Sequence, residues 1–295
     1  MARWPRADRP GARRRLAIAL VAATLLVTAA ARGGEPPRLA FARHGAAVAT
    51  RDLETLKTSI PVAEIRVHEP YEQREARFAA LPFDQVLDAI YSPSWRGEEE
   101  LLLTCADGYQ PTVPVARFLR HRAWLAFDRS DGAGFTIEKR ESGEIRRVPL
   151  APFYLIWENL EDARIRQEAD YGWPYQLVAV DLIRSRDRFP KMTPPVTASP
   201  QVLAGFTAFR VHCSKCHRVH GEGGRIGPEL VSTASPLEYR DAEWLRTWIV
   251  DPARILPQAR MPALNPALPD RERVVNEILA YLRALLPDRA PPEDG

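Results

Sequence analysis

The sequence of 295 residues predicts a chain with two folded parts, an N-terminal α+β part with substantial sheet and a C-terminal part that is all α. The length is that of about two domains at roughly 150 residues each. Short strand-like runs separated by glycine turns fill the first part, whereas the second shows the 3.6-residue apolar periodicity of helices. A proline-rich segment, residues 191–200, separates them, and we expect it to be a stiff linker.

The first 31 residues predict a signal peptide. Six arginines and one aspartate precede an apolar run from Leu16 to Ala31, whose last small residues offer a cleavage site. This run of 16 residues is shorter than the roughly 20 that a membrane span needs. We therefore expect a periplasmic protein, with a retained inner-membrane anchor as the alternative.

The charge distribution gives no indication of a nucleic-acid partner. The formal net charge is +3, but residues 1–31 contribute +5 and leave −2 for the remainder. A nucleic-acid-binding domain would present a basic patch or stripe. None is visible in the sequence, so we expect no such partner.

Apolar runs justify the α+β part, which we expect over residues 36–190. Phe83–Ile90 has the pattern of a short amphipathic helix. Cys105 ends a buried strand, and we expect it to be a core residue, with a metal ligand or a reactive thiol as alternatives. Six aromatic residues are expected to pack in the core or between the two parts, with a partner-docking surface as the alternative: Phe153, Tyr154, Trp157, Tyr171, Trp173 and Tyr175. The expected strands are Ala63–Val67, Glu100–Cys105, Ala123–Phe127, Phe135–Lys139 and Gln176–Leu182.

Three helices justify the C-terminal part, which we expect over residues 201–287. The first covers Gln201–His212, and the second begins at Asp241 and stops before a proline. The third covers Arg271–Leu286, and Asp270 is expected to cap it. So few helices cannot bury a large core by themselves.

Between the first two helices lies the run Cys213-Ser214-Lys215-Cys216-His217, which is C-x-x-C-H, the attachment signature of a c-type haem. Two thiols at this spacing can each form a thioether to one porphyrin, and the adjacent imidazole can ligate its iron. A thioredoxin-like redox pair and half of a zinc site are the alternatives. The following histidine argues against the first, and the lack of a second C-x-x-C or H-x-x-x-H argues against the second. One covalent haem would also supply the missing apolar volume.

Further residues around this run match the sequence pattern of a known protein family. They are Gly205 and Phe209, Gly227-Pro228-Glu229-Leu230, Arg260-Met261-Pro262 and Tyr281-Leu282. With them, residues 201–287 resemble a class I monohaem cytochrome c domain. The resemblance implies that the first and last helices cross with Gly205 against Tyr281. It also implies that the loop with Pro228 supports the proximal His217.

The sixth iron ligand is expected to be Met261. Only Met1, Met192 and Met261 occur, and the first two lie in the signal peptide and the proline linker. Met261 precedes the last helix, where the family places its distal methionine. A methionine that only packs against haem is one alternative. Ligation by His212 or His220 is another, although both lie close in sequence to the proximal side.

The α+β part matches the sequence pattern of another known family, although less closely. The stretches are Leu81–Leu87, Ala106–Tyr109 with Val113–Val115, Ala123–Phe127, and Val148–Leu150 with Phe153–Leu155. Their order is similar to the molybdopterin-binding domain of the sulfite oxidase family. No cysteine precedes Phe83, and we do not equate Cys105 with that family's molybdenum ligand. We therefore expect a cofactor-free relative.

These observations predict an exported electron carrier rather than an enzyme. Its single covalent haem c would exchange electrons by outer-sphere transfer with a donor and an acceptor protein, such as a periplasmic dehydrogenase or oxidase. The first part would serve as a docking or scaffold module. One alternative is an oxidoreductase whose first part binds a metal or molybdopterin. Another is a haem-based sensor.

Overall fold

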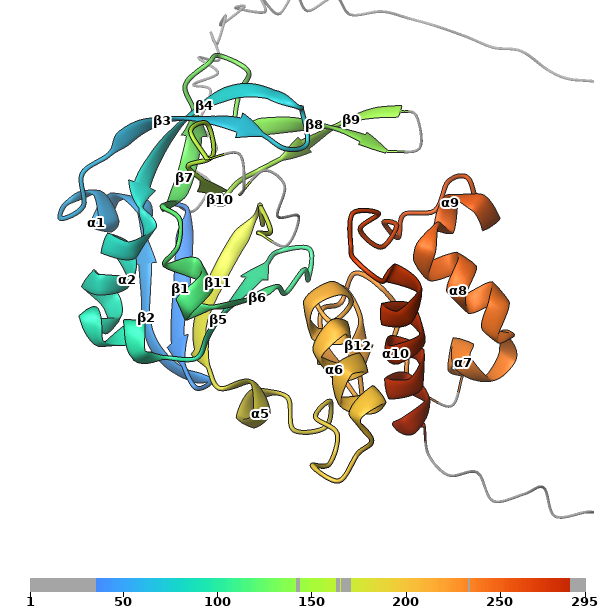
Figure 1. Cartoon of the computed structure of the whole chain (residues 1–295). Coiled ribbons are helices and arrows are strands. Elements are labelled where there is room, and N and C mark those ends of the chain that lie inside the picture. The colour runs from blue at the N-terminus through green and yellow to red at the C-terminus, as the bar shows by residue number, and fades with distance from the viewer. Residues whose placement is uncertain (1–35, 142–143, 163–164, 166–170, 233, 287–295) are drawn as a thin grey trace, which may run out of the picture. The chain divides into compact units, whose positions relative to one another are not determined.

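The computed structural model describes residues 36–141, 144–162, 165, 171–232 and 234–286 (Figure 1). The expected signal peptide, residues 1–31, lies outside them. Among the described residues, no helix is both long enough and apolar enough to cross a membrane.

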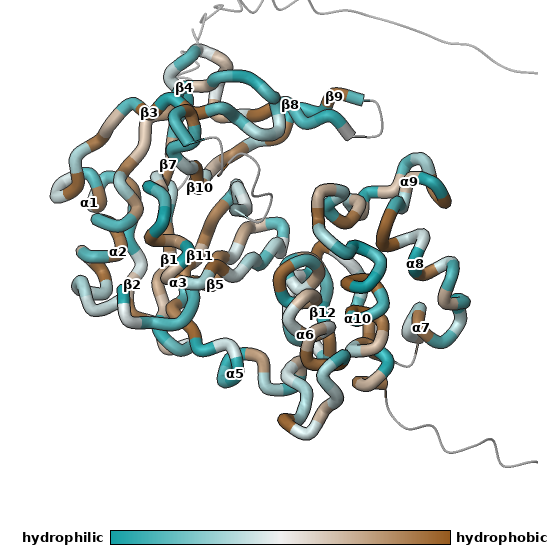
Figure 2. The backbone as a smooth tube through the Cα atoms, in the orientation of Figure 1, coloured by the Kyte–Doolittle hydropathy of each residue, from teal (hydrophilic) through white to brown (hydrophobic). Residues whose placement is uncertain are grey.

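A five-stranded sheet in the order β2-β1-β11-β5-β6 forms one side of the N-terminal part. Only β1 and β11 are parallel, with Ala40 opposite Ala179, and the other neighbours are antiparallel. The strands that lie within the sheet have the apolar sequences expected there: Figure 2 shows hydrophobic residues along β5 and β11. The bounds are β1 Arg38–Arg43, β2 Ala46–Asp52, β5 Glu100–Cys105, β6 Thr112–Pro114 and β11 Leu177–Ile183.

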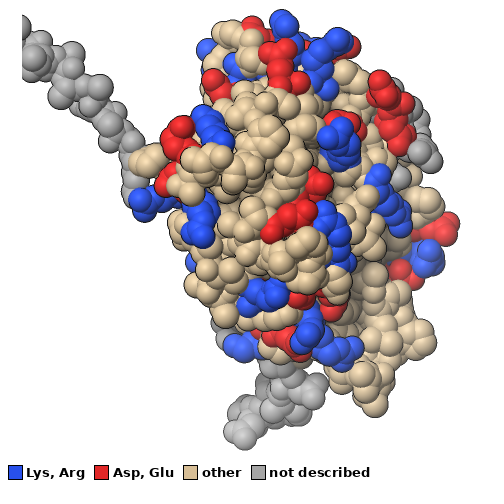
Figure 3. Space-filling view, turned by 90° about the vertical axis from the view of Figure 1, so that its left-hand side faces the viewer, with Lys and Arg blue, Asp and Glu red and all other residues tan. Residues whose placement is uncertain are grey.

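A four-stranded antiparallel sheet in the order β10-β7-β4-β3 forms the second layer. Its strands are β3 Ala63–Glu69, β4 Arg74–Pro82, β7 Ala123–Arg129 and β10 Tyr154–Trp157. A separate hairpin pairs β8 Thr136–Glu141 with β9 Glu144–Pro149. The face in Figure 3 carries interspersed basic and acidic side chains without a large patch of one sign.

Short helices connect the strands of both sheets. In α2, Phe83–Tyr91, the residues Phe83, Val86 and Leu87 recur at helical spacing and are buried. The others are α1 Leu53–Lys57, the 3₁₀ helix η1 Pro93–Gly97, α3 Val115–Phe118 and α5 Ser185–Arg188.

Aromatic side chains dominate the core of this part. The ring of Phe118 lies 5.3–5.8 Å, edge to face, from the rings of Phe83, Trp95 and Trp157. The prediction that the six aromatics from Phe153 to Tyr175 pack internally is confirmed, since five are buried and Tyr175 packs against the same cluster.

The C-terminal part is helical, as predicted. Besides the three expected helices it has two four-residue helices and the two-residue strands β12 Arg218–Val219 and β13 Glu222–Gly223. The expectation that Asp270 caps the last helix is wrong. Its backbone is left-handed (φ 50°), its side chain caps no backbone N–H, and its carboxylate pairs with Arg273 instead. The helices are α6 Pro200–His212, α7 Pro236–Tyr239, α8 Ala242–Val250, α9 Pro252–Ile255 and α10 Arg271–Ala284.

The crossing of α6 and α10 depends on Gly205. A Cβ there would lie 1.9 Å from the Glu277 carbonyl oxygen and 2.8 Å from the Cβ of Tyr281. Only glycine therefore allows the two backbones to approach this closely. The expected contact between Gly205 and Tyr281 is confirmed.

The proline-rich segment is more than a connection. Met192 is fully buried, its carbonyl accepts a 2.7 Å hydrogen bond from the Tyr281 hydroxyl, and Phe189 is also buried. Both belong to a cluster that includes Leu102 of β5 and Phe209 of α6. The two parts therefore share a hydrophobic core.

Candidate functional site

The C-x-x-C-H run forms a tight turn at the end of α6. Cys213 is the C-cap of that helix, and its carbonyl accepts hydrogen bonds from the N–H groups of Cys216 (3.0 Å) and His217 (2.9 Å). The Ser214 hydroxyl donates to the Arg210 carbonyl at 2.8 Å. These bonds bring both cysteines and the histidine onto one turn.

The imidazole of His217 is oriented by the next loop. Its Nδ1 lies 3.0 Å from the Pro228 carbonyl oxygen, so Nδ1 carries the proton and donates it. The neutral Nε2 is then left as a free ligand atom. Burial also lowers the pKa of His217, and the lower pKa favours this neutral form. The predicted support of His217 by Pro228 thus comes from a backbone carbonyl rather than from the proline ring.

Glycines hold this loop against the turn. A Cβ on Gly227 would lie 2.3–2.8 Å from three atoms of the His217 ring, and a Cβ on Gly224 would lie 2.0 Å from the Lys215 carbonyl oxygen. Neither distance is compatible with a side chain. The cradle therefore accounts for two glycines of the sequence.

Cys213 and Cys216 are half-buried free thiols and form no disulfide with each other. Burial raises the pKa of Cys213 to about 12 and that of Cys216 above its ordinary value. Catalytic redox dithiols show the opposite shift, toward the thiolate. The pair fits covalent attachment of haem, in which each thiol becomes a thioether.

Met261 lies half-buried in the loop between α9 and α10. The Arg271 guanidinium fixes this loop by donating to the carbonyls of Leu264 and Val250, the second at 2.5 Å. The Leu264 N–H donates to Ile249 of α8 at 3.0 Å. Sequence reasoning missed Arg271, because a basic residue at the start of a helix looks like a solvated one.

His220 is exposed, with a left-handed backbone (φ 51°), in the turn between β12 and β13. His212 is the last residue of α6 and directly precedes the attachment turn. Both therefore stay on the chain segment that carries His217.

The β5–β6 loop, residues 106–111, meets the attachment turn. The Gln110 N–H donates to the Lys215 carbonyl at 2.9 Å, and the Arg225 N–H donates to the Gly108 carbonyl at 2.9 Å. Nothing in the sequence pattern pointed to this contact, because it joins segments about a hundred residues apart.

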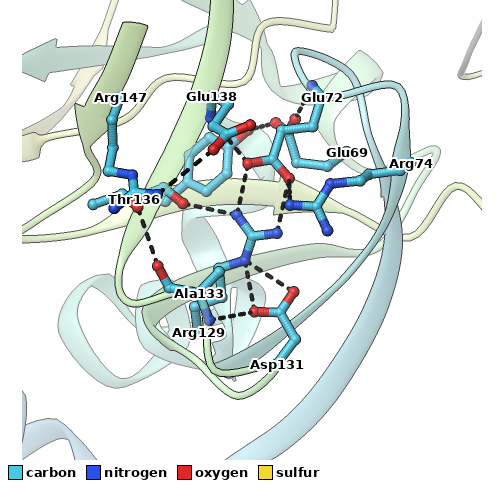
Figure 4. A network of polar contacts seen from close by, with 10 residues as sticks. Glu69, Glu72, Arg74, Arg129, Asp131, Ala133, Thr136, Glu138 and Arg147 are labelled. Carbon is cyan, nitrogen blue, oxygen red and sulfur yellow. Dashed lines mark hydrogen bonds and ion pairs between the residues drawn. The ribbon is translucent and has the colours of Figure 1, made fainter. Parts of the chain in front are cut away.

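A second polar cluster lies at the end of β7 and in the turn between β3 and β4 (Figure 4). The buried Arg129 guanidinium donates to both carboxylate oxygens of Glu72, to Asp131 and to the Thr136 carbonyl. Arg74 pairs with the same Glu72 at 2.8 Å. Every charge in this cluster has a partner, so it fits a structural role. In the part of the chain that the structure describes, no three His, Cys, Asp or Glu residues gather as a metal site.

Cys105 is 3% exposed at the end of β5, and burial raises its pKa far above the ordinary value. A neutral buried thiol suits the predicted core role.

The family model described as Cytochrome c matches residues 202–285. The segment is a cytochrome c domain, which implies covalently bound haem c and redox partners. No curated protein matches the chain. The resemblance of residues 36–190 to a molybdopterin-binding domain stays a prediction.

Proposed function

We propose that this chain, which carries a cytochrome c domain at residues 202–285, is an exported electron carrier with a single haem. In this proposal Cys213 and Cys216 form the two thioethers. His217 and Met261 would hold the iron. The observation that carries the proposal is the orientation of the His217 ring by the Pro228 carbonyl within the C-x-x-C-H turn.

When bound, the haem supplies one-electron chemistry. The chain's residues hold it and set its surroundings. Pro228 keeps Nε2 of His217 unprotonated and fixes its direction, and Gly227 lets the loop lie against the ring. A methionine sulfur as sixth ligand would close the remaining coordination position and favour the ferrous state. Electron exchange is then outer-sphere.

Residues 36–190 act as a scaffold or docking module that presents the haem to a donor and an acceptor protein. Their core is closed by packed aromatic rings, and the Arg129 cluster is internally neutralised. The apolar run Leu16–Ala31 supports export to the periplasm.

The test compares two methionine variants of the haem-loaded protein. Met261→Ala should lower the reduction potential and allow carbon monoxide to bind the reduced haem. Met192→Leu, which keeps the volume of a buried side chain but removes its thioether, should leave both properties unchanged. A pyridine haemochrome assay and elemental analysis on the same sample should give one covalent haem and iron alone.

An unchanged absorption spectrum and reduction potential in Met261→Ala would refute the assignment of Met261 as an iron ligand. A second stoichiometric metal would favour the alternative of an oxidoreductase whose N-terminal part holds that metal.

A further inference from the structure

We propose that the β5–β6 loop, residues 106–111, is a fixed cover over the Cys216 side of the haem-attachment turn. Soluble redox partners would then exchange electrons with the haem elsewhere on its edge. The inference rests on the proposed function, because it assumes that the turn carries haem.

Two backbone hydrogen bonds hold the cover in place. One runs from the Gln110 N–H to the carbonyl of Lys215, which directly precedes Cys216. The other runs from the Arg225 N–H, next to the glycine cradle, to the Gly108 carbonyl. Backbone groups paired in this way are shielded from water, and leaving them buried without partners would be costly.

Gly108 is adapted to this contact. Its φ of 91° is one that other residues rarely adopt, and a Cβ there would lie 3.0 Å from the Cβ of Arg225. A side chain would therefore press directly on the opposite segment. The glycine serves the interface as well as the turn between the strands.

Tyr109 fills the space behind the loop. Its side chain packs against the aromatic core, with the hydroxyl beside Gly172. Burial raises the pKa of Tyr109, and the nearby Cys216 and Cys105 thiols add to this effect.

An ion pair anchors the loop's two strands to the haem-bearing helix. The Arg210 guanidinium of α6 donates to Glu100 of β5 at 2.5 Å and to the Thr112 hydroxyl of β6 at 3.3 Å. Ser185 donates to the same carboxylate at 2.6 Å. Because both strands that carry the loop are tied to α6, the cover is held at its base and at its tip.

The experiment opens the cover in the full-length, haem-loaded protein. Gly108→Val forces a side chain onto Arg225. Gly132→Val is the matched control, because Gly132 has a similar φ of 83° but no atom within 4 Å of its Cβ position. Tyr109→Ala removes the cover's side chain without backbone strain, with Tyr239→Ala, a 64% exposed tyrosine, as its control.

Two readouts are needed. Hydrogen exchange of the Gln110 and Arg225 amides reports whether the loop is docked. Stopped-flow oxidation of the ferrous protein by hexacyanoferrate(III), and by a cationic cobalt complex to separate charge effects, reports access to the haem. We expect both amides to be protected in the wild type. Oxidation should be several-fold faster in Gly108→Val and Tyr109→Ala, and unchanged in both controls.

Unprotected amides in the wild type would overturn the inference, as would unchanged oxidation rates in Gly108→Val once its amides have lost protection. If the Gln110 and Arg225 amides stay protected in Gly108→Val, or if that variant fails to fold, Tyr109→Ala becomes the deciding variant. An unchanged oxidation rate in Tyr109→Ala would then refute the cover. Absence of covalent haem in the wild type would instead refute the proposed function.

Discussion

Replacing Gly227 by alanine tests the cradle around the histidine. The added Cβ would lie 2.3 Å from Cε1, 2.5 Å from Nδ1 and 2.8 Å from Nε2 of His217. Ordinary contact begins near 3.4 Å, so the ring and the loop must separate by about 1 Å. Since Pro228 adjoins Gly227, this separation also lengthens the 3.0 Å bond between Nδ1 and the Pro228 carbonyl.

The expected cost has two components. Overpacking typically costs about 1–3 kcal/mol, and the weakened hydrogen bond about 0.5–1.5 kcal/mol. Alanine reduces the freedom of the unfolded chain, which offsets about 0.4–1 kcal/mol. We therefore expect the free energy of unfolding to fall by about 2 kcal/mol.

The assay is urea unfolding of the haem-loaded protein, followed by the haem absorption, together with the midpoint potential of each variant. Gly97→Ala is the control, because no atom lies within 4 Å of its Cβ position. It should leave both the unfolding midpoint and the potential unchanged. Equal stability and potential in Gly227→Ala and Gly97→Ala would refute the cradle.

Two further variants test the framework by urea unfolding. Gly205→Ala should destabilise the protein by about 2 kcal/mol or more through the clash with Glu277, although alanine favours the helix by about 1 kcal/mol. An unchanged urea midpoint would contradict the close crossing of α6 and α10. Burial alone would raise the pKa of Glu72, but hydrogen bonds from Arg129 and the Glu138 N–H hold it below 4.5. The stabilisation that ionised Glu72 provides should therefore be complete above about pH 4.5 and should be lost as the pH falls through its lower pKa in the folded protein. The free energies of unfolding of wild type and Glu72→Gln should differ by about 3 kcal/mol at neutral pH and become equal in acid. A difference that does not change with pH would contradict this.

The helices and strands could be predicted where a local sequence pattern indicates which side chains are buried. The strand Glu100–Cys105 and the helix starting at Phe83 were expected where they occur, because runs of apolar residues and helical spacing record which faces are covered. Strand β2 was not expected. It is an edge strand with mostly exposed residues, and its position depends on pairing with β1 rather than on a buried face.

The residues proposed to bind haem could be recognised in the sequence for a different reason. C-x-x-C-H combines reactive groups at a spacing that a short turn brings together, so no long-range information is needed. The cover over that turn, in contrast, depends on Gly108 meeting Arg225, and neither residue indicates its partner. Asp270 shows the converse, because its type favours capping while its left-handed backbone prevents it.

The domain boundary that the prolines indicate in the sequence does not coincide with the boundary of the hydrophobic core. Prolines mark a break near residue 200, yet Phe189 and Met192 contribute side chains to the cluster that Phe209 and Tyr281 complete. A fragment that begins at residue 201 would lack both, and the Tyr281 hydroxyl would lose its acceptor. An excised haem domain should therefore start at about Ser185, and even then it would expose the surface that Leu102 covers.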